Sequence, residues 1–185
     1  PDEILVAASI CEVTTIIKSG GAQAVFAAAY GTERVPKVDK IVGPGNKYVT
    51  AAKQMVYGQV DIDKPAGPSE VAVYVEDQVY ASYAASECLA QLEHDPESIA
   101  VVVSPSVEVL EKIQVALEEQ RTECKRQEII DQSIQNCYLV EVSDQQEGVS
   151  VLNDLASEHV VLLVDEFESI LEKVEHGGSI FCGPY

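Results

Sequence analysis

The sequence contains no tryptophan and few other aromatic or basic residues. No Trp, one Met and three Phe occur among 185 residues, and 12 Lys and Arg are outnumbered by 31 Asp and Glu, for a formal net charge of −19. This negative excess repels phosphate backbones and anionic lipid headgroups. We therefore expect no nucleic-acid partner and no membrane partner. A small anionic cofactor is still compatible, because backbone donors and helix termini act locally.

Long hydrophobic runs and cysteine pairs are also missing. No apolar stretch approaches the roughly 18 residues that cross a bilayer, and no basic-then-apolar leader opens the chain. The chain begins with Pro1 rather than Met, so we expect a processing boundary there. The cysteine number is odd and no CxxC occurs; the residues are Cys11, Cys88, Cys124, Cys137 and Cys182. Buried thiols in a reducing compartment explain this better than disulfides or a thiolate metal site. We expect a cytoplasmic protein, or a plastid protein if the source is a plant.

The hydrophobic pattern changes at a cluster of Pro and Gly. With 46% hydrophobic residues, the chain can bury a sizeable core. Lys64-Pro65-Ala66-Gly67-Pro68 is the strongest turn signal, and we place a domain boundary there. Residues 1–66 are rich in helical patterns, whereas residues 67–185 alternate short β-branched runs with helical stretches. This alternation predicts an α/β fold of two Rossmann-like, incomplete lobes with mostly parallel sheets.

The predicted elements follow from hydrophobic periodicity and from capping, Gly and Pro residues. The predicted strands are 38–42, 71–75, 99–103, 138–142, 160–164 and 180–182. The predicted helices are 3–19, 22–30, 47–57, 80–93, 107–122, 145–155 and 167–176. The run 160–164 is apolar on both faces, as a strand covered by helices on both sides must be.

Gly43-Pro44-Gly45-Asn46 follows a predicted strand and begins a predicted helix. Anions and nucleotide phosphates often bind at such a position. The segment differs from the GxGxxG dinucleotide pattern, because Tyr48 stands where the third Gly belongs. A structural turn is therefore the favoured interpretation when the segment is taken alone.

The segment 62–70 is a glycine-bearing hinge that presents the Ser69 hydroxyl and the Glu70 carboxylate. Ligands commonly bind at hinges between domains. The alternative is a loop in which Ser69 is an ordinary cap or turn residue.

Gln91 and His94 occur near the end of a predicted helix, in Gln91-Leu92-Glu93-His94-Asp95-Pro96. Spacing of i, i+3 would place both side chains on one helical face, where both could reach one ion. Imidazole is a good zinc ligand, but a neutral amide oxygen is an unusual one. From spacing alone, a histidine that favours the helix dipole is the more common explanation. His176, beside Gly177-Gly178, is predicted to be only such a C-terminal cation.

Glu158-His159 lies between a predicted helix and a strongly apolar strand. An adjacent acid and imidazole suit general acid–base chemistry, since His titrates near neutral pH and Glu can be tuned toward it. Two loop residues without chemistry are the favoured alternative. The pair also precedes its strand, whereas α/β sites usually lie at the carboxyl ends of strands.

Taken together and in order, these segments resemble the histidinol dehydrogenase family over nearly the whole chain. The matching stretches are GGAQA (20–24), VPKVDKIVGPGN (35–46), AGPSE (66–70), QLEHDP (91–96) and ASEH (156–159). One such stretch is weak evidence, whereas five in register are highly specific.

The resemblance implies binding roles that spacing alone does not give. It implies a zinc- and NAD-dependent enzyme that is a homodimer at full length and acts on the small molecule L-histidinol. Gln91 and His94 would bind zinc and substrate, and Ser69 would contact the substrate. Gln23 and Asn46 would contact NAD. Zinc in the family chiefly holds the substrate in place, so it would supply orientation more than Lewis acidity.

The resemblance also implies a catalytic pair, Glu158 and His159, for the four-electron oxidation of L-histidinol to L-histidine in histidine biosynthesis. His159 would contact the substrate and take the alcohol proton as hydride leaves its carbon, which gives histidinaldehyde. Glu158 would then activate water on the aldehyde, before a second hydride transfer gives the carboxylate.

The chain departs from the family pattern in sequence and in length. Leu92 replaces a small residue, Ser157 replaces a proline, and Glu12 replaces a glycine. Family members are much longer, and their remaining zinc ligands, an Asp and a His, fall beyond Tyr185. An N-terminal portion with one cofactor contact is also absent. Two protein ligands are too few for a closed zinc site, so we expect the isolated chain to be inactive.

Two alternatives remain at this point. One is a zinc- and NAD-dependent alcohol dehydrogenase on the same scaffold that oxidises another small alcohol, such as a sulfonated diol. The other is a non-catalytic assembly module that keeps only the fold. A module of this kind would have lost the residues assigned to zinc and acid–base chemistry. All four of them are present in this chain: Gln91, His94, Glu158 and His159.

Overall fold

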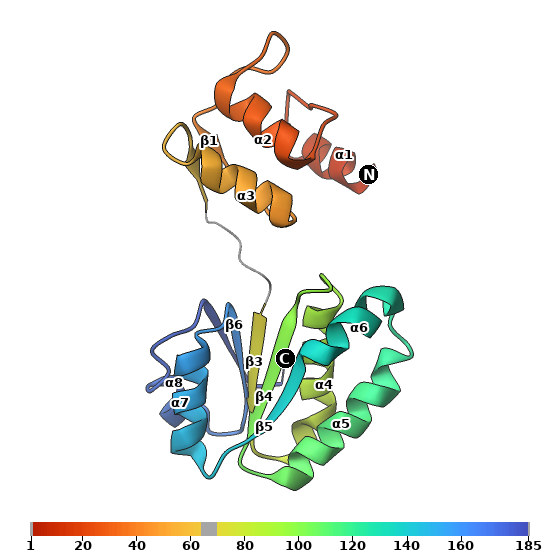
Figure 1. Ribbon diagram of the computed structural model, residues 1–185, viewed down its shortest axis with the longest axis vertical. Coiled ribbons are helices and arrows are strands. Elements are labelled where there is room, and N and C mark those ends of the chain that lie inside the picture. Colours follow the sequence, from red (N-terminus) through yellow and green to blue (C-terminus); the bar gives the residue numbers. More distant parts are fainter. Residues whose placement is uncertain (1, 64–69, 185) are drawn as a thin grey trace. The chain divides into compact units, whose positions relative to one another are not determined.

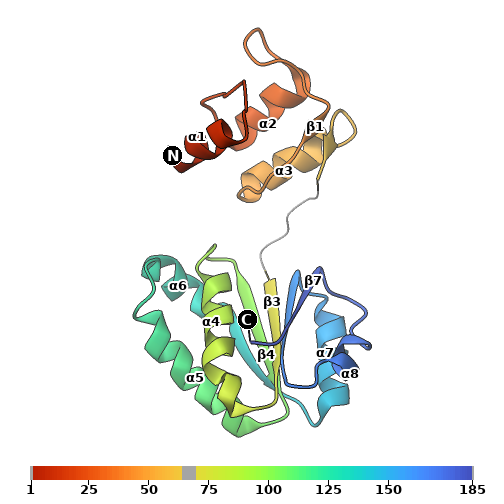
Figure 2. The ribbon, with the colours of Figure 1, turned by 180° about the vertical axis from the view of Figure 1, so that it is seen from behind.

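The computed structural model describes residues 2–63 and 70–184. The chain divides into two compact units, Pro1–Gly67 and Pro68–Tyr185, and each unit has its own core. Figures 1 and 2 show the elements of both units from opposite sides.

The first unit contains three helices and a very short sheet among its described residues. These elements are α1 (Asp2–Ile10), α2 (Gly21–Tyr30), β1 (Lys40–Ile41), α3 (Lys47–Val56) and β2 (Asp61–Ile62). The strands β1 and β2 pair in parallel. A small core of Val25, Ala29, Ala52, Val56 and Val60 joins α2 to α3. Helix α1 buries none of its residues.

The second unit is built on a five-stranded parallel sheet with the order β5-β4-β3-β6-β7. Its strands are β3 (Glu70–Val75), β4 (Ile99–Ser104), β5 (Cys137–Glu141), β6 (His159–Leu163) and β7 (Ser179–Cys182). Its α-helices are α4 (Ala81–Leu92), α5 (Val107–Arg121), α6 (Gln127–Ser133), α7 (Gln145–Leu155) and α8 (Glu168–Leu171). Two 3-10 turns, η1 (Gln78–Tyr80) and η2 (Ile134–Asn136), complete it. The predicted α/β class with parallel sheets is confirmed.

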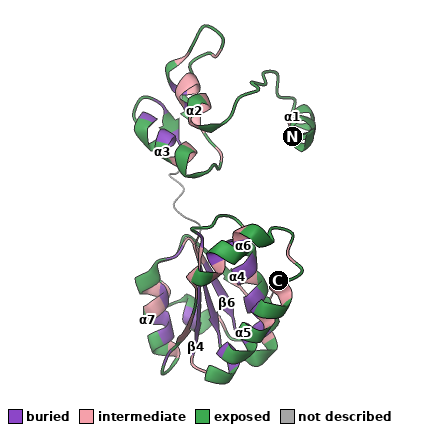
Figure 3. Cartoon of the chain, turned by 45° about the vertical axis from the view of Figure 1, so that its right-hand side comes forward, coloured by how far each residue is buried: buried purple, intermediate pink, exposed green. Residues whose placement is uncertain are grey.

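Alternating side chains of the central strand β3 build the two sides of this core. Val71, Val73 and Val75 pack with α4, α5 and α6, whereas Ala72 and Tyr74 pack with α7 and α8. Figure 1 shows these two groups of helices on opposite sides of the sheet, and Figure 3 shows the strands as the most buried part of the unit. Each fully buried aliphatic side chain stabilises the fold by about 1.5–3 kcal/mol, so the apolar strands fix the sheet.

Two predicted helices are shorter than their sequence patterns suggest. The helix predicted for 3–19 ends at Ile10, where Glu12 takes a left-handed conformation with φ 55°. The left-handed residue closes the helix as a left-handed cap does. The helix predicted for 167–176 ends at Leu171. The backbone amides of Glu175 and His176 donate instead to the side chain of Asn153. The prediction that His176 is a helix C-terminal cation is therefore wrong.

The cysteines are all free thiols, as expected, but not all are buried. Cys88 is buried on α4, and its thiol hydrogen-bonds with that of Cys137 on β5, which raises the pKa of Cys88. Cys11 is exposed, so the expectation of burial is wrong there. No helix in the described parts of the chain has the length and apolar character needed to span a membrane.

Candidate active site

Gln91 is a buried polar side chain on the last turn of α4. Its neighbours Cys88 and Leu92 belong to the core, and Gln91 itself is only 6% exposed. Its Oε1 atom lies 3.4 Å from Nδ1 of His159. Its Nε2 atom is buried and has no hydrogen-bond partner among the described residues. Exchanging the amide oxygen and nitrogen would only move the missing bond to the other atom.

Leaving such a group unsatisfied costs about 1–3 kcal/mol. The packing of α4 does not require a polar side chain at this position, since the rest of its inner face is apolar. A buried amide with one spare hydrogen-bonding atom is therefore a place where a ligand would be stabilised.

His159 is the first residue of β6 and lies between two other elements. Its backbone pairs with Val71 of β3 on one side and Ser179 of β7 on the other. Its ring meets Phe181 of β7 edge to face, with centroids 5.8 Å apart. If Nδ1–H donates to the Gln91 oxygen, Nε2 of His159 is left unprotonated and can accept a proton. The imidazole is thus oriented from both α4 and β7.

The backbone before His159 is held by a close approach of two chain segments. The carbonyl of Glu158 accepts from the amide of Ser179 at 2.8 Å, and that of Ser157 accepts from Gly178 at 3.1 Å. A Cβ at Gly178 would lie 2.6 Å from the Glu158 carbonyl oxygen, so only glycine fits without moving backbone. Gly178 therefore helps to place the Glu158-His159 pair.

His94, the other residue predicted to bind zinc, is not joined to this contact. His94 lies in the exposed turn beyond α4, which ends at Leu92, so the argument from a shared helical face is wrong. Its side chain makes no hydrogen bond to the residues that the structure describes, although its amide donates to the carbonyl of Gln91. Ser69 lies outside the described residues. Within 2–63 and 70–184, no three His, Cys, Asp or Glu residues are arranged to hold a metal ion.

The two residues predicted to contact NAD belong to the first unit. Gln23 is exposed on the first turn of α2. Asn46 caps α3, because its Oδ1 accepts from the amides of Tyr48 at 3.1 Å and Val49 at 3.2 Å. A Cβ at Gly45 would lie 2.4 Å from Val49, which explains the glycine in this turn. The close packing of this turn is compatible with a purely structural role and also with binding of a cofactor.

A separate pocket of about 420 Å³ lies at the carboxyl ends of β3 and β6. Its lining residues are Glu76, Asp77, Tyr80, Gln145, Val164, Asp165, Glu166 and Ser169. The Tyr80 hydroxyl donates to Asp165, and this bond raises the pKa of Tyr80. Gln145 donates to Glu76 at 3.2 Å. Parallel α/β sheets usually bind ligands at this end, but the carboxylates here disfavour an anionic nucleotide.

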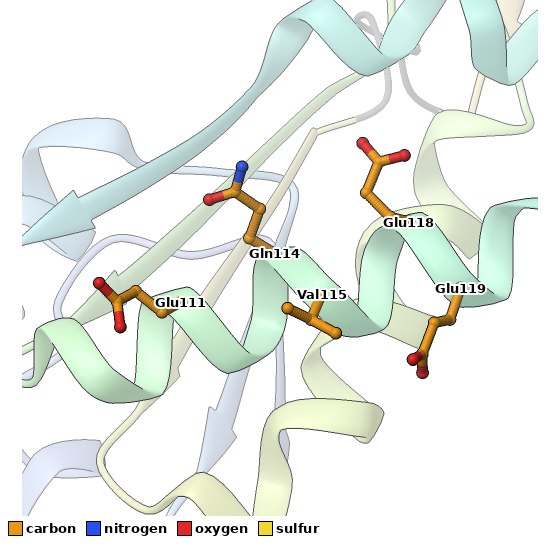
Figure 4. Close-up of a pocket in the computed structure, with 5 residues that line it drawn as sticks. All are labelled: Glu111, Gln114, Val115, Glu118 and Glu119. Carbon is orange, nitrogen blue, oxygen red and sulfur yellow. The ribbon is translucent and has the colours of Figure 1, made fainter.

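A hollow of about 460 Å³ on the surface of α5 has a different character. All five residues that line it, Glu111, Gln114, Val115, Glu118 and Glu119, are exposed and belong to this one helix. Figure 4 shows their side chains spread along its length. Binding sites need polar groups that converge from several elements, so we assign no function to this hollow.

Comparison with known proteins gives a consistent result over the whole chain. The family model described as histidinol dehydrogenase matches residues 1–185. Relatives named histidinol dehydrogenase include one from Halalkalibacterium halodurans, 46% identical over 100% of this chain and 44% of its own length. Another, from Methanothermobacter thermautotrophicus, is 45% identical over 99% of this chain and 43% of its own length. The chain thus spans less than half the length of these relatives.

Solved structures agree with the sequence relatives. The crystal structure of histidinol dehydrogenase from Elizabethkingia anophelis matches with a TM-score of 0.92 and 34% identity, over 98% of this chain and 42% of that one. A gamma-glutamyl phosphate reductase from Thermotoga maritima matches with a TM-score of 0.55 and 10% identity, over 90% of this chain and 45% of that one. The second match concerns the fold alone.

Proposed function

The chain belongs to the histidinol dehydrogenase family of oxidoreductases, and we propose that it carries the acid–base half of that family's active site. The observation that carries the proposal is the buried Gln91 amide against the imidazole of His159. One atom of this amide has no hydrogen-bond partner within residues 2–63 and 70–184. The proposed full-length activity is the NAD-dependent oxidation of L-histidinol to L-histidine through histidinaldehyde, a step of histidine biosynthesis.

We propose that His159 takes the hydroxyl proton of the alcohol as hydride leaves the adjacent carbon. Its orientation by Gln91 and Phe181 supports this role, because a general base needs a fixed, unprotonated nitrogen. Glu158 then accepts a proton from the water that adds to the aldehyde carbon. A second hydride leaves that carbon, and the carboxylate forms. NAD would supply the oxidising power, since two NAD molecules bound in turn would each accept one hydride.

The chain's donors fit a zinc ion only in part. The spare amide atom of Gln91 suits a ligand role, and His94 adds an imidazole that must turn toward it from the exposed turn. Catalytic zinc usually has three protein ligands and an open position, so the remaining ligands must come from elsewhere in the full-length protein. When bound, the ion would chiefly orient the substrate beside His159. Ser69 is proposed as a further substrate contact, and Gln23 and Asn46 as NAD contacts.

We place the full-length enzyme in the cytoplasm, or in the plastid of a plant, and propose that it is a homodimer. The relatives compared above are named histidinol dehydrogenase, which favours histidinol over a sulfonated diol as substrate. The presence of Gln91, Glu158 and His159 argues against a purely structural module, since such a module would have no use for an unsatisfied buried amide.

A hybrid enzyme tests this function, in which these 185 residues replace the matching segment of the Halalkalibacterium halodurans relative. We expect it to form NADH from L-histidinol and not from a sulfonated propanediol. Glu158→Gln should still oxidise histidinol to the aldehyde but release histidine about 10²–10⁴-fold more slowly, the usual contribution of one acid–base group. Oxidation of the diol in preference to histidinol, or an unchanged yield of histidine from the variant, would refute the proposal.

A further inference from the structure

Lys53 is a buried charged residue in the first unit that the proposed mechanism does not use. It lies on the inner face of α3 between the core residues Ala52 and Val56, and only 4% of it is exposed. Lysine is almost never buried to this extent without partners, because removing its charge from water is costly.

The partners of Lys53 are Asp63 and the backbone of Gly43. Its Nζ forms an ion pair with Asp63 and donates to the carbonyl of Gly43 at 2.9 Å. The other oxygen of Asp63 accepts from the amide of Gly43 at 2.8 Å. The pair therefore binds both polar backbone groups of this one residue.

Gly43 begins the turn that ends at Asn46. It adopts φ 121°, a conformation that L side chains rarely take. The turn is thus held at its start by the ion pair and at its end by the Asn46 cap on α3. A buried ion pair is a poor source of stability compared with apolar residues of similar size, so a conformational role explains its presence better.

We propose that Lys53 and Asp63 are positioning residues for NAD, which act by fixing the Gly43–Asn46 turn. The inference rests on the proposed function, in which Asn46 contacts NAD. Neither side chain touches the cofactor; each sets the backbone from which Asn46 projects.

The test replaces both charges at once in the hybrid enzyme, as Lys53→Met with Asp63→Asn, so that no unpaired charge is left buried. We expect the KM and the dissociation constant for NAD to rise about tenfold, the scale on which supporting partners tune a bound group, with kcat and the KM for histidinol within about twofold. Asp63→Glu keeps the charge pair but shifts the carboxylate, and it should raise the same NAD constants by a smaller factor. This second variant decides the question if the double variant does not fold.

The matched control is the neighbouring ion pair of Lys40 and Asp61, which is 2.9 Å long with side chains 53% and 58% exposed. Lys40→Met with Asp61→Asn removes the same charges from the same unit and should leave NAD binding unchanged. Equal effects of the two double variants, or a loss of thermal stability with normal NAD constants, would overturn the positioning role. NAD binding measured by calorimetry without substrate keeps this result separate from failure of histidinol oxidation. A hybrid enzyme that binds no NAD would overturn both proposals.

Discussion

The two ends of the five-stranded sheet differ in chemistry. At the amino ends of β3 and β6, a buried amide meets an imidazole beside a glutamate. At the carboxyl ends of the same strands, Glu76, Asp165 and Glu166 line an acidic pocket. In this pocket Tyr80 already donates to Asp165, and Gln145 donates to Glu76. The end that parallel α/β folds normally use for ligands is thus the less suitable one here. The position of a site follows from its residues, and the fold gives only a first expectation.

The largest expected effect concerns the completeness of the amino-end site. The isolated chain should bind zinc weakly and show no meaningful NAD-dependent oxidation of histidinol. Gln91 and His94 supply only two donors, and the loss of substrate positioning can cost about 7–11 kcal/mol of barrier. Zinc titration by calorimetry and NADH absorbance check both statements. Turnover near that of a full-length relative would show that the amino-end groups are sufficient by themselves.

A pair of glutamine variants compares the two ends directly. Gln91→Met in the hybrid enzyme should lower turnover by at least about 10²-fold, whereas Gln145→Met at the carboxyl end should not change it. The same Gln91→Met change should stabilise the isolated chain by about 1–3 kcal/mol, because it removes an unsatisfied buried amide. Activity assays and thermal melts measure the two effects. If Gln145→Met proves the more damaging variant, the site lies at the other end.

Alanine substitutions at two glycines test whether the backbone at the amino end of the sheet matters for activity. Gly178→Ala places a methyl group against the Glu158 carbonyl and should lower turnover by up to about 10²-fold, the cost of a misplacement near 1 Å. Gly148→Ala brings a Cβ within 2.4 Å of the Tyr74 ring and should cost about 1–3 kcal/mol of stability with normal kcat. Kinetic assays should therefore show the larger effect for Gly178→Ala, and thermal melts should show the larger effect for Gly148→Ala. A kcat that falls equally in both variants would contradict a local role for Gly178.

The smallest expected effect lies in the acidic pocket. The hydrogen bond that Tyr80 donates to Asp165 raises the pKa of Tyr80, so Asp165→Asn should lower that pKa toward its ordinary value. Ultraviolet titration of Tyr80, with Tyr80→Phe as the blank, measures the change. Histidinol oxidation in the hybrid enzyme should not respond to either substitution. A response of kcat would mean that the carboxyl end takes part in the reaction.

The sequence predicted the sheet well because its strands are buried on both faces. Continuous apolar runs such as 71–75 and 160–164 leave few alternatives to covered parallel strands. The helix ends were harder, because tertiary contacts decide them. Asn153 takes over backbone donors that a longer α8 would have used, and the short helix α6 has too few residues to show a period.

The candidate site was predictable only in its polar residues. Gln91, Glu158 and His159 are unusual beside apolar runs, and the resemblance to a family gave them roles. Phe181 was missed because its contact depends on strand register: Ser179 pairs with His159, which places Phe181 diagonally across from the imidazole. The role of Gly178 was also missed, because its close approach to the Glu158 carbonyl appears only when β6 and β7 are paired.

The central place of β3 has a consequence for how the protein is made. β3 is the first strand of its sheet in the chain, yet one of its edges pairs with β6, which is synthesised long after β4. Until β6 leaves the ribosome, the edge of this largely apolar strand stays open to other nascent chains, which is an aggregation hazard. His159 is the residue that starts this closing strand. We therefore expect maturation of the proposed acid–base pair to coincide with protection of the growing polypeptide from misassembly.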